Sequence, residues 1–160
     1  MVSIELRVRK PTRSKEIDYT QEGLFFITIC THERKCLLSK IDKNQDLEDA
    51  KSVLTSIGEI VEKHLIGLEK RYSVEIINYV IMPNHIHFII LVSNRGLHLS
   101  NIICAFKSLI SRECNNIFGI SPLFQRSYYD HVIRNQQDYN EVWEYIENNP
   151  TKWVINKDKI

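Results

Sequence analysis

Two apolar runs separated by a Pro–Asn step constrain the fold of this chain more than any other feature. The first run, VEIINYVIM, covers residues 74–82, and the second, HIHFIILV, covers residues 85–92. Both are rich in β-branched residues, which favour strands. Pro83 and Asn84 between them favour a tight turn. The pattern therefore predicts two neighbouring strands joined by a short connection, and a sheet at the centre of the fold.

The segments before and after these runs add further strands and a long helix. Residues 24–31, LFFITICT, and residues 127–134, SYYDHVIR, have the β-branched and aromatic content of strands. From Asp46 to about Tyr72, apolar residues recur at steps of three and four, which places them on one helix face. Asp46 is the expected N-cap of this predicted helix.

Two more helices are predicted in the second half of the chain. Residues 99–117 carry apolar side chains at helical spacing, with Ser100 as the expected cap and Gly119 beyond the end. Residues 138–149 form the last predicted helix, closed by Pro150. The order is strand, helix, strand, strand, helix, strand and an extra helix. It matches an α+β, ferredoxin-like βαββαβ sandwich with a mainly antiparallel sheet covered by helices.

Length and composition limit the classes of protein to consider. A chain of 160 residues suits a single domain (1–160), and 43% hydrophobic with 26% charged residues is ordinary globular usage. The apolar runs fall short of the ~20 residues of a membrane helix, and the N-terminus lacks the apolar core of a signal peptide. Four cysteines without CxxC spacing predict reduced thiols and a cytoplasmic protein.

Positive charge is concentrated at the N-terminus. The whole chain has a formal net charge of only +1. Residues 1–18 form a basic arm that holds Arg7, Arg9, Lys10, Arg13 and Lys15. A basic arm on a nearly neutral body suits contact with phosphates, and a solvated flexible terminus explains the same pattern equally well.

His85 and His87 are the sharpest candidates for chemistry. Residues i and i+2 of a strand point to the same face, so the two imidazoles are expected to stand side by side. Their neighbours are apolar, and two buried polar rings each need a partner. A shared divalent metal would satisfy both, and hydrogen bonds to backbone or carboxylate would serve as well. His131 is a weaker candidate to line a site.

Tyr145 and Asn149 form the second candidate pair, one turn apart on the last predicted helix. A tyrosine beside an apolar helix face is often a half-buried packing residue. Its phenol oxygen can also act as a covalent nucleophile when it is placed in line with a phosphate. An asparagine carbonyl oxygen suits a hard cation as an additional ligand.

Taken together, these motifs resemble a known family. The string YVIMPNHIH (79–87) resembles the His-hydrophobe-His (HUH) metal motif of single-tyrosine transposases, with the best match to the REP-associated tyrosine transposase branch. GLFFITICTHER (23–34), FQRSYYDHVIR (124–134) and YIENNP (145–150) support the resemblance, which spans about residues 11–153. The ordered set of motifs is specific, whereas HxH alone is not.

The resemblance implies roles for individual residues. His85 and His87 match the metal-binding histidines, Tyr145 matches the nucleophile, and Asn149 matches the third metal ligand, where insertion-sequence relatives more often carry Gln. The implied activity is a DNA transposase that cleaves and rejoins single-stranded DNA near hairpins. It would use a 5′-phosphotyrosine intermediate and a divalent metal, Mg²⁺ or Mn²⁺.

The implied partner is single-stranded or hairpin DNA, and a homodimer is compatible with the resemblance. The expected phosphate contacts are Arg7, Arg9, Lys10, Arg13, Lys107, Arg112, Arg126 and Arg134. Two other functions remain open. One is a non-catalytic hairpin-DNA-binding protein derived from such a transposase. The other is an unrelated metal-dependent phosphodiester hydrolase, which would require a further histidine near His87 and would not require Tyr145.

Overall fold

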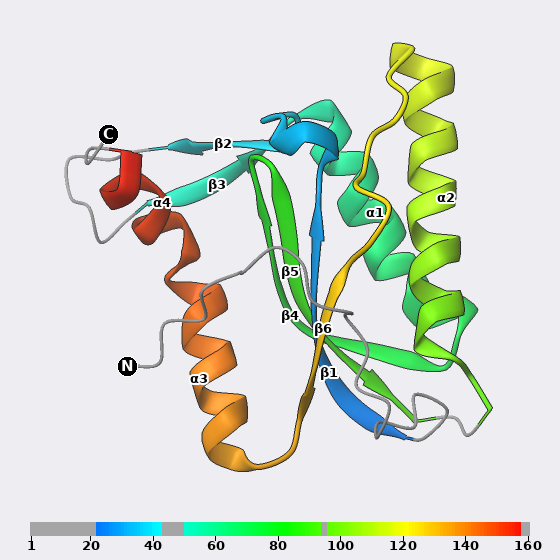
Figure 1. The fold of residues 1–160 in the computed structure, drawn as a ribbon, viewed down its shortest axis with the longest axis vertical. Coiled ribbons are helices and arrows are strands. Elements are labelled where there is room, and N and C mark those ends of the chain that lie inside the picture. The colour runs from blue at the N-terminus through cyan, green and yellow to red at the C-terminus, as the bar shows by residue number, and fades with distance from the viewer. Residues whose placement is uncertain (1–21, 43–49, 94–95, 158–160) are drawn as a thin grey trace.

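A four-stranded antiparallel sheet forms the centre of the computed structural model, which describes residues 22–42, 50–93 and 96–157 (Figure 1). The strands lie in the order β4-β5-β1-β6, and each neighbouring pair is antiparallel. They are β1 (Gly23–Cys30), β4 (Val74–Met82), β5 (His85–Val92) and β6 (Tyr129–Ile133). The strands expected from the sequence are confirmed, and so is the α+β class.

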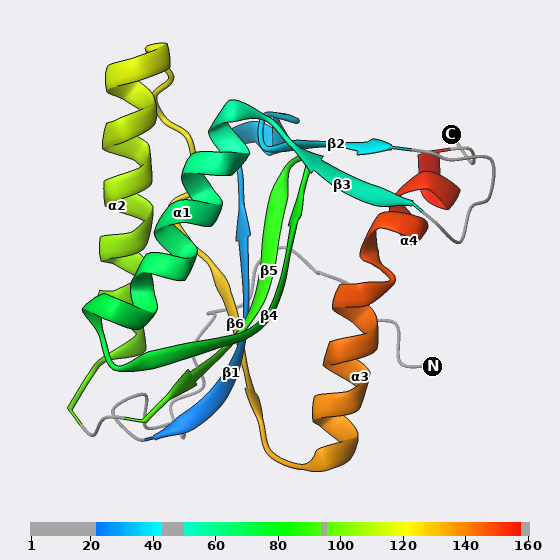
Figure 2. The same ribbon diagram turned by 180° about the vertical axis from the view of Figure 1, so that it is seen from behind.

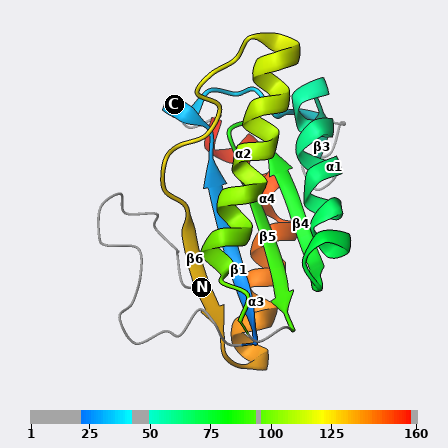
Figure 3. The same cartoon turned by 90° about the vertical axis from the view of Figure 1, so that its right-hand side faces the viewer.

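Helices cover both faces of this sheet. α1 (Ser56–Arg71) and α2 (Leu99–Phe118) lie on one face, and α3 (Gln136–Glu147) lies on the other (Figure 3). Alternate residues of β5 point to opposite faces of the sheet. Phe88 packs in the core beneath α1 and α2, whereas Ile89 packs with Val142 of α3. Burial on both sides explains why β5 is an almost continuous apolar run. None of the described helices is long and apolar enough to cross a membrane.

The predicted helix over residues 46–72 is wrong in its first part. Lys51–Leu54 form strand β3, which pairs with β2 (Ser39–Asp42) in a second, two-stranded sheet. This small sheet extends toward the C-terminal helix α4 (Figure 2). Residues 50 and 54 fit a helical step of four equally well, so periodicity alone did not separate the two structures. The predicted cap Asp46 lies outside the described residues.

Thr55 sets the true start of α1. Its hydroxyl oxygen accepts a hydrogen bond from the Gly58 backbone N–H (3.1 Å) and is itself within donating distance of the Leu38 carbonyl (3.0 Å). This contact is typical of an N-cap. It also binds the start of α1 to the segment that precedes β2, and so fixes where the helix can begin.

Two further helix ends differ from the expectation. α2 starts after His98, which provides no side-chain cap, so the predicted cap Ser100 lies one residue inside the helix. Gly119 ends α2 in a left-handed conformation (φ 67°), as expected. Pro150 does not close the chain's last helix: α3 ends at Glu147, and Pro150 lies in the first turn of α4 (Asn149–Lys157). A proline is tolerated there because its missing N–H has no helical partner.

The close approach at Gly58 gives a test of the fold. A Cβ atom at this position would lie 2.0 Å from the Leu38 carbonyl oxygen, which is backbone and cannot move aside cheaply. We expect Gly58→Ala to lower the free energy of unfolding by about 1–3 kcal/mol. Urea denaturation followed by circular dichroism measures the change.

Gly67→Ala in the same helix is the matched control. Nothing lies within 4 Å of a Cβ atom built at Gly67. This substitution should therefore raise the free energy of unfolding by about 0.4–1 kcal/mol, since alanine restricts the unfolded chain and favours the helix. Equal effects of the two substitutions would contradict the proposed contact between α1 and the segment before β2.

Candidate functional site

His85 and His87 lie at the start of β5, on the sheet face that α3 covers. His85 is 9% exposed and His87 is 1% exposed. Their ring centroids are 4.6 Å apart, so the two imidazoles stand side by side as the strand spacing predicts. Thr28 lies opposite His87 in the neighbouring strand β1, and Cys30 lies opposite His85. The pair is therefore held between a rigid strand and the helix layer.

Asn84 fixes which nitrogen of His85 carries the proton. Its Oδ1 atom lies 2.7 Å from His85 Nδ1, and its amide nitrogen donates to the Arg34 carbonyl (3.4 Å). Because the amide oxygen can only accept, His85 Nδ1 must be the donor. The other nitrogen, Nε2, is left with a free lone pair. That is the arrangement in which a histidine binds a metal.

His87 also has a hydrogen-bonding partner at Nδ1, a hydroxyl that can donate or accept. Its Nδ1 atom lies 2.7 Å from the Thr28 hydroxyl oxygen. Its Nε2 atom is buried and has no hydrogen-bond partner among the described residues. A buried polar atom without a partner costs about 1–3 kcal/mol, so such atoms are rare unless a ligand satisfies them. The unpartnered nitrogen is the strongest indication that this site takes a ligand.

Asn149 adds an oxygen to the same place. This residue begins α4 and is 7% exposed. Its amide nitrogen donates to the Tyr145 carbonyl (3.3 Å), and its Oδ1 atom lies 3.3 Å from His85 Nε2. With His85 protonated on Nδ1, two lone pairs face each other across that gap. A cation bound by both atoms would remove the conflict.

The donor set fits a divalent metal. Burial lowers the pKa of His85 to about 4, the hydrogen bond that a protonated ring would donate to Asn149 opposes this shift, and the charge of Arg34 adds to it. Burial also lowers the pKa of His87 well below its usual range. Both imidazoles are thus neutral at physiological pH, which is the form that binds metals. Among the described residues no group of three His, Cys, Asp or Glu side chains could hold a metal. A metal at this place would therefore need the Asn149 oxygen in addition to the two imidazoles.

Tyr145 of the same chain lies against this pair. Its ring centroid is 5.1 Å from that of His87 and 6.0 Å from that of Phe26, in both cases edge to face. Lys152 Nζ lies 5.0 Å from the centre of the tyrosine ring. Although α3 ends at Glu147, the turn into α4 keeps Tyr145 and Asn149 together, as their spacing predicted.

Arg34 is a residue that the sequence analysis did not single out as a site residue. It follows β1, where Glu33 (φ 54°) and Arg34 (φ 57°) both adopt left-handed backbone conformations. Such conformations in non-glycine residues cost of order 1–3 kcal/mol and cluster at functional sites. The Arg34 guanidinium donates to the Cys30 sulfur (2.8 Å) and forms no ion pair within the described part of the chain. Arg34 lies in the matching segment 23–34, which was the only signal for it.

Of the residues predicted to contact phosphate, those that the structure describes lie at different distances from the histidine pair. Arg7, Arg9, Lys10 and Arg13 lie outside the described residues. Lys107 and Arg112 are on α2, which covers the sheet face opposite α3, and the Lys107 amine donates to the carbonyls of Gln125 and Arg126. Arg126 lies at the histidine end of the sheet, since Gln125 before it donates to the Cys30 carbonyl. Arg134 follows the far end of β6.

His131 lies on the same sheet face as the histidine pair but contacts Asp138. Its Nε2 atom lies 2.9 Å from both carboxylate oxygens of Asp138. Asp138 also accepts from the Arg134 backbone N–H (3.3 Å). These contacts tie the end of β6 to the first turn of α3. His131 therefore helps to position the helix that carries Tyr145, and does not join the His85–His87 pair.

Comparisons with known proteins indicate the family of this chain. Residues 25–149 match the family model described as "Transposase IS200 like". An uncharacterized protein of Haemophilus influenzae is 31% identical over 167 residues, covering 91% of this chain and 89% of that protein. The REP-associated tyrosine transposase of Escherichia coli K12 is 25% identical over 85% of this chain and 72% of its own length.

A solved structure shares the fold. It is that of a REP-associated tyrosine transposase bound to a REP hairpin. Its TM-score with this chain is 0.65 at 24% sequence identity, and the match covers 88% of this chain and 74% of that one. Since the family model matches residues 25–149, well over half of the sequence, the chain belongs to the IS200-like transposase family.

Proposed function

We propose that this protein cleaves and rejoins single-stranded DNA near hairpins, with Tyr145 as the nucleophile and a divalent metal, Mg²⁺ or Mn²⁺, held by His85, His87 and Asn149. The observation that carries the proposal is the unpartnered, buried His87 Nε2 atom beside the Tyr145 ring. Membership of a transposase family supports the reaction class. The relative solved with a REP hairpin, on the same strand and helix plan, supports the substrate class and a ferredoxin-like core.

The reaction is a transesterification. The Tyr145 oxygen attacks the scissile phosphorus, the bond from phosphorus to the 3′ oxygen breaks, and a 5′-phosphotyrosine forms. The tyrosine hydroxyl loses its proton, and the departing 3′ oxygen gains one. A bound metal supplies Lewis acidity to a non-bridging phosphate oxygen. No water is consumed, so a 3′-hydroxyl can reverse the step and rejoin a strand.

The residues around Tyr145 and the histidines prepare this step. Phe26 and His87 both pack edge to face with the tyrosine ring and limit its orientation. This restraint reduces the entropy cost of an in-line attack. Lys152 near the ring and Arg34 at the end of β1 add positive charge close to the phosphate. These two residues extend the set of phosphate contacts beyond those that the sequence suggested.

Removal of one oxygen atom tests the nucleophile. Tyr145→Phe keeps the ring that packs on Phe26 and His87. We expect the wild type to form a covalent protein–DNA product with end-labelled single-stranded oligonucleotides from the gene's own flanks in Mn²⁺. We expect the Tyr145→Phe variant to form none, because among the seven tyrosines we assign the nucleophile to Tyr145, whose ring lies against His87. A denaturing gel separates the products, and EDTA should abolish the band in the wild type.

The same gel distinguishes the competing functions. Cleavage that persists in Tyr145→Phe without a covalent band would favour a metal-dependent hydrolase. Binding of the flanking DNA without any cleavage by the wild type would favour a non-catalytic hairpin-binding protein. Either result would refute the proposed mechanism.

Metal binding can be measured without DNA. Mn²⁺ titration calorimetry should detect one site in the wild type, and His87→Ala should abolish it because a ligand is lost. Thr28→Val removes the group that orients His87 and should weaken binding about 10–100-fold. His98→Ala, at an exposed histidine outside the site, is the control and should bind as the wild type does. Unchanged binding in His87→Ala would exclude this metal site.

The proposed role of Arg34 can be tested with a substitution at the neighbouring Lys35 as the control. Arg34→Ala should slow formation of the covalent product on the order of 100-fold if the guanidinium stabilises charge on the reacting phosphate. Lys35→Ala removes an exposed cation that pairs with Glu33 (3.3 Å), and should change the rate little. Single-turnover rates at saturating DNA separate this effect from binding. An equal loss in both variants would indicate only a general effect of charge.

A further inference from the structure

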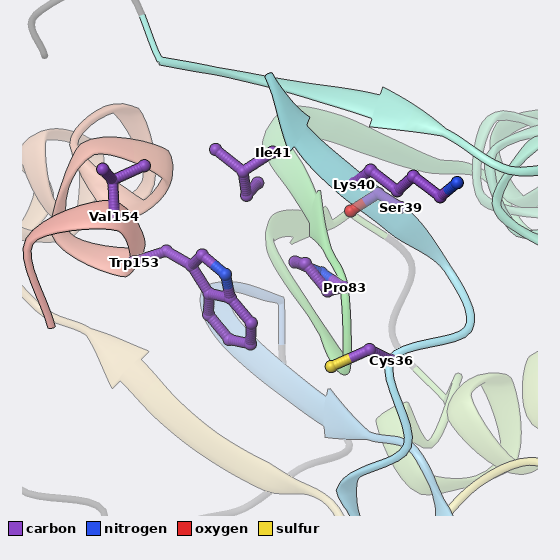
Figure 4. Close-up of a pocket in the computed structure, with 7 residues that line it drawn as sticks. All are labelled: Cys36, Ser39, Lys40, Ile41, Pro83, Trp153 and Val154. Atoms are coloured by element: carbon purple, nitrogen blue, oxygen red, sulfur yellow. The ribbon is translucent and has the colours of Figure 1, made fainter. Parts of the chain in front are cut away.

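A cavity of about 300 Å³ lies between the β2 strand and helix α4, next to the proposed active site. Trp153 and Val154 of α4 form one side, and Cys36 and Ser39 form the other. Pro83 lies between the two sides (Figure 4). The volume is at the lower end of the range for small-ligand sites.

The walls of this cavity combine one flat aromatic surface with few polar groups. The Trp153 indole faces the space, and the Cys36 sulfur and the Ser39 oxygen point toward it from the opposite side (Figure 4). The Lys40 amine points away. The polar groups that face the cavity are therefore neutral, which suits an uncharged, planar ligand with a small number of hydrogen-bonding atoms.

Ser39 supplies an independent indication of a ligand. Its side chain is only 2% exposed, and its hydroxyl oxygen has no hydrogen-bond partner among the described residues. A hydroxyl can both donate and accept. Leaving it unpaired in a buried position is unfavourable, and a ligand atom that pairs with it would remove that cost.

The position of the cavity indicates which ligand reaches it. The Trp153 ring centroid is 6.1 Å from that of His85. Pro83 lines the cavity, and Asn84 next to it fixes the His85 tautomer, so the β4–β5 turn separates the cavity from the histidine pair. A strand with a phosphate at the histidine pair would have its neighbouring nucleotides beside Trp153.

We propose that this cavity receives one unpaired nucleobase of the DNA strand, adjacent to the phosphate that is cleaved. The base would stack on Trp153 and pair one edge atom with the Ser39 hydroxyl. This inference rests on the proposed function. A base has the planar, uncharged form that the walls suit, and extrusion into an aromatic pocket is how proteins read single unpaired bases.

The test combines a Trp153 variant with a scan of abasic sites. Anisotropy titrations in EDTA would measure binding of single-stranded oligonucleotides from the gene's flanks, each lacking one base. For wild type, one abasic position should weaken binding about tenfold, the loss typical of one stacked base. Trp153→Leu should bind the intact strand about tenfold more weakly and be insensitive to that same abasic position. Thermal unfolding checks that the variant is folded.

Ser39→Ala is the second variant, and it separates binding from folding. Loss of an unpartnered hydroxyl should leave the midpoint of thermal unfolding unchanged or raise it. Binding of the intact strand should nevertheless weaken by a few-fold, with no change for the strand that lacks the pocket base. If Ser39 had only a structural role, Ser39→Ala would lower the midpoint of thermal unfolding and leave DNA binding unchanged.

The outcomes distinguish this inference from the proposed function. If Trp153→Leu weakens every strand by the same factor, or none, the nucleobase pocket is refuted while DNA binding stands. Suppose instead that the wild type forms the covalent product while every abasic position has the same effect in the wild type and in Trp153→Leu. That result would refute the nucleobase pocket and leave the proposed function standing. If the wild type binds none of the oligonucleotides, both proposals fail.

Discussion

The neutral, buried state of the His85–His87 pair is the constraint on which the rest of the site depends. Two adjacent imidazoles cannot both be charged in a desolvated position, and burial keeps their pKa values low. Asn84 Oδ1 accepts from His85 Nδ1, which leaves His85 Nε2 to accept, and Thr28 pairs with His87 Nδ1. The structure thus maintains a buried, unpartnered His87 Nε2 atom at a stability cost that a ligand would offset.

Three separate parts of the chain must meet for this arrangement to exist. The central strands β1 and β5 provide the histidines and the hydroxyl that orients one of them. The β4–β5 turn provides Asn84, and the junction of α3 and α4 provides Tyr145 and Asn149. Strands position the two imidazoles, whereas Tyr145, the proposed nucleophile, comes from a helix that packs on them.

Much of this could be predicted from the sequence, and the failures have physical causes. Strong apolar runs gave the bounds of β4 and β5, and the HxH spacing placed the two imidazoles together. Strands β2 and β3 were missed because they hold few apolar residues, and those around β3 also fit a helical spacing. Arg34 was missed because its place near the histidines follows two left-handed backbone conformations, at Glu33 and Arg34, which no local pattern of residue types indicates.

The two faces of the sheet differ in how firmly they are covered. α1 and α2 bury a large apolar core, whereas the core beneath α3 consists of Phe26, Ile89, Ile133, Val142 and Ile146. Local opening is easier where fewer buried apolar contacts must break. A local opening would therefore release α3 before α1 and α2, because fewer buried side chains hold it. Under the proposed function, such an opening would move Tyr145, and a DNA end joined to it, while the sheet and the opposite core stay folded.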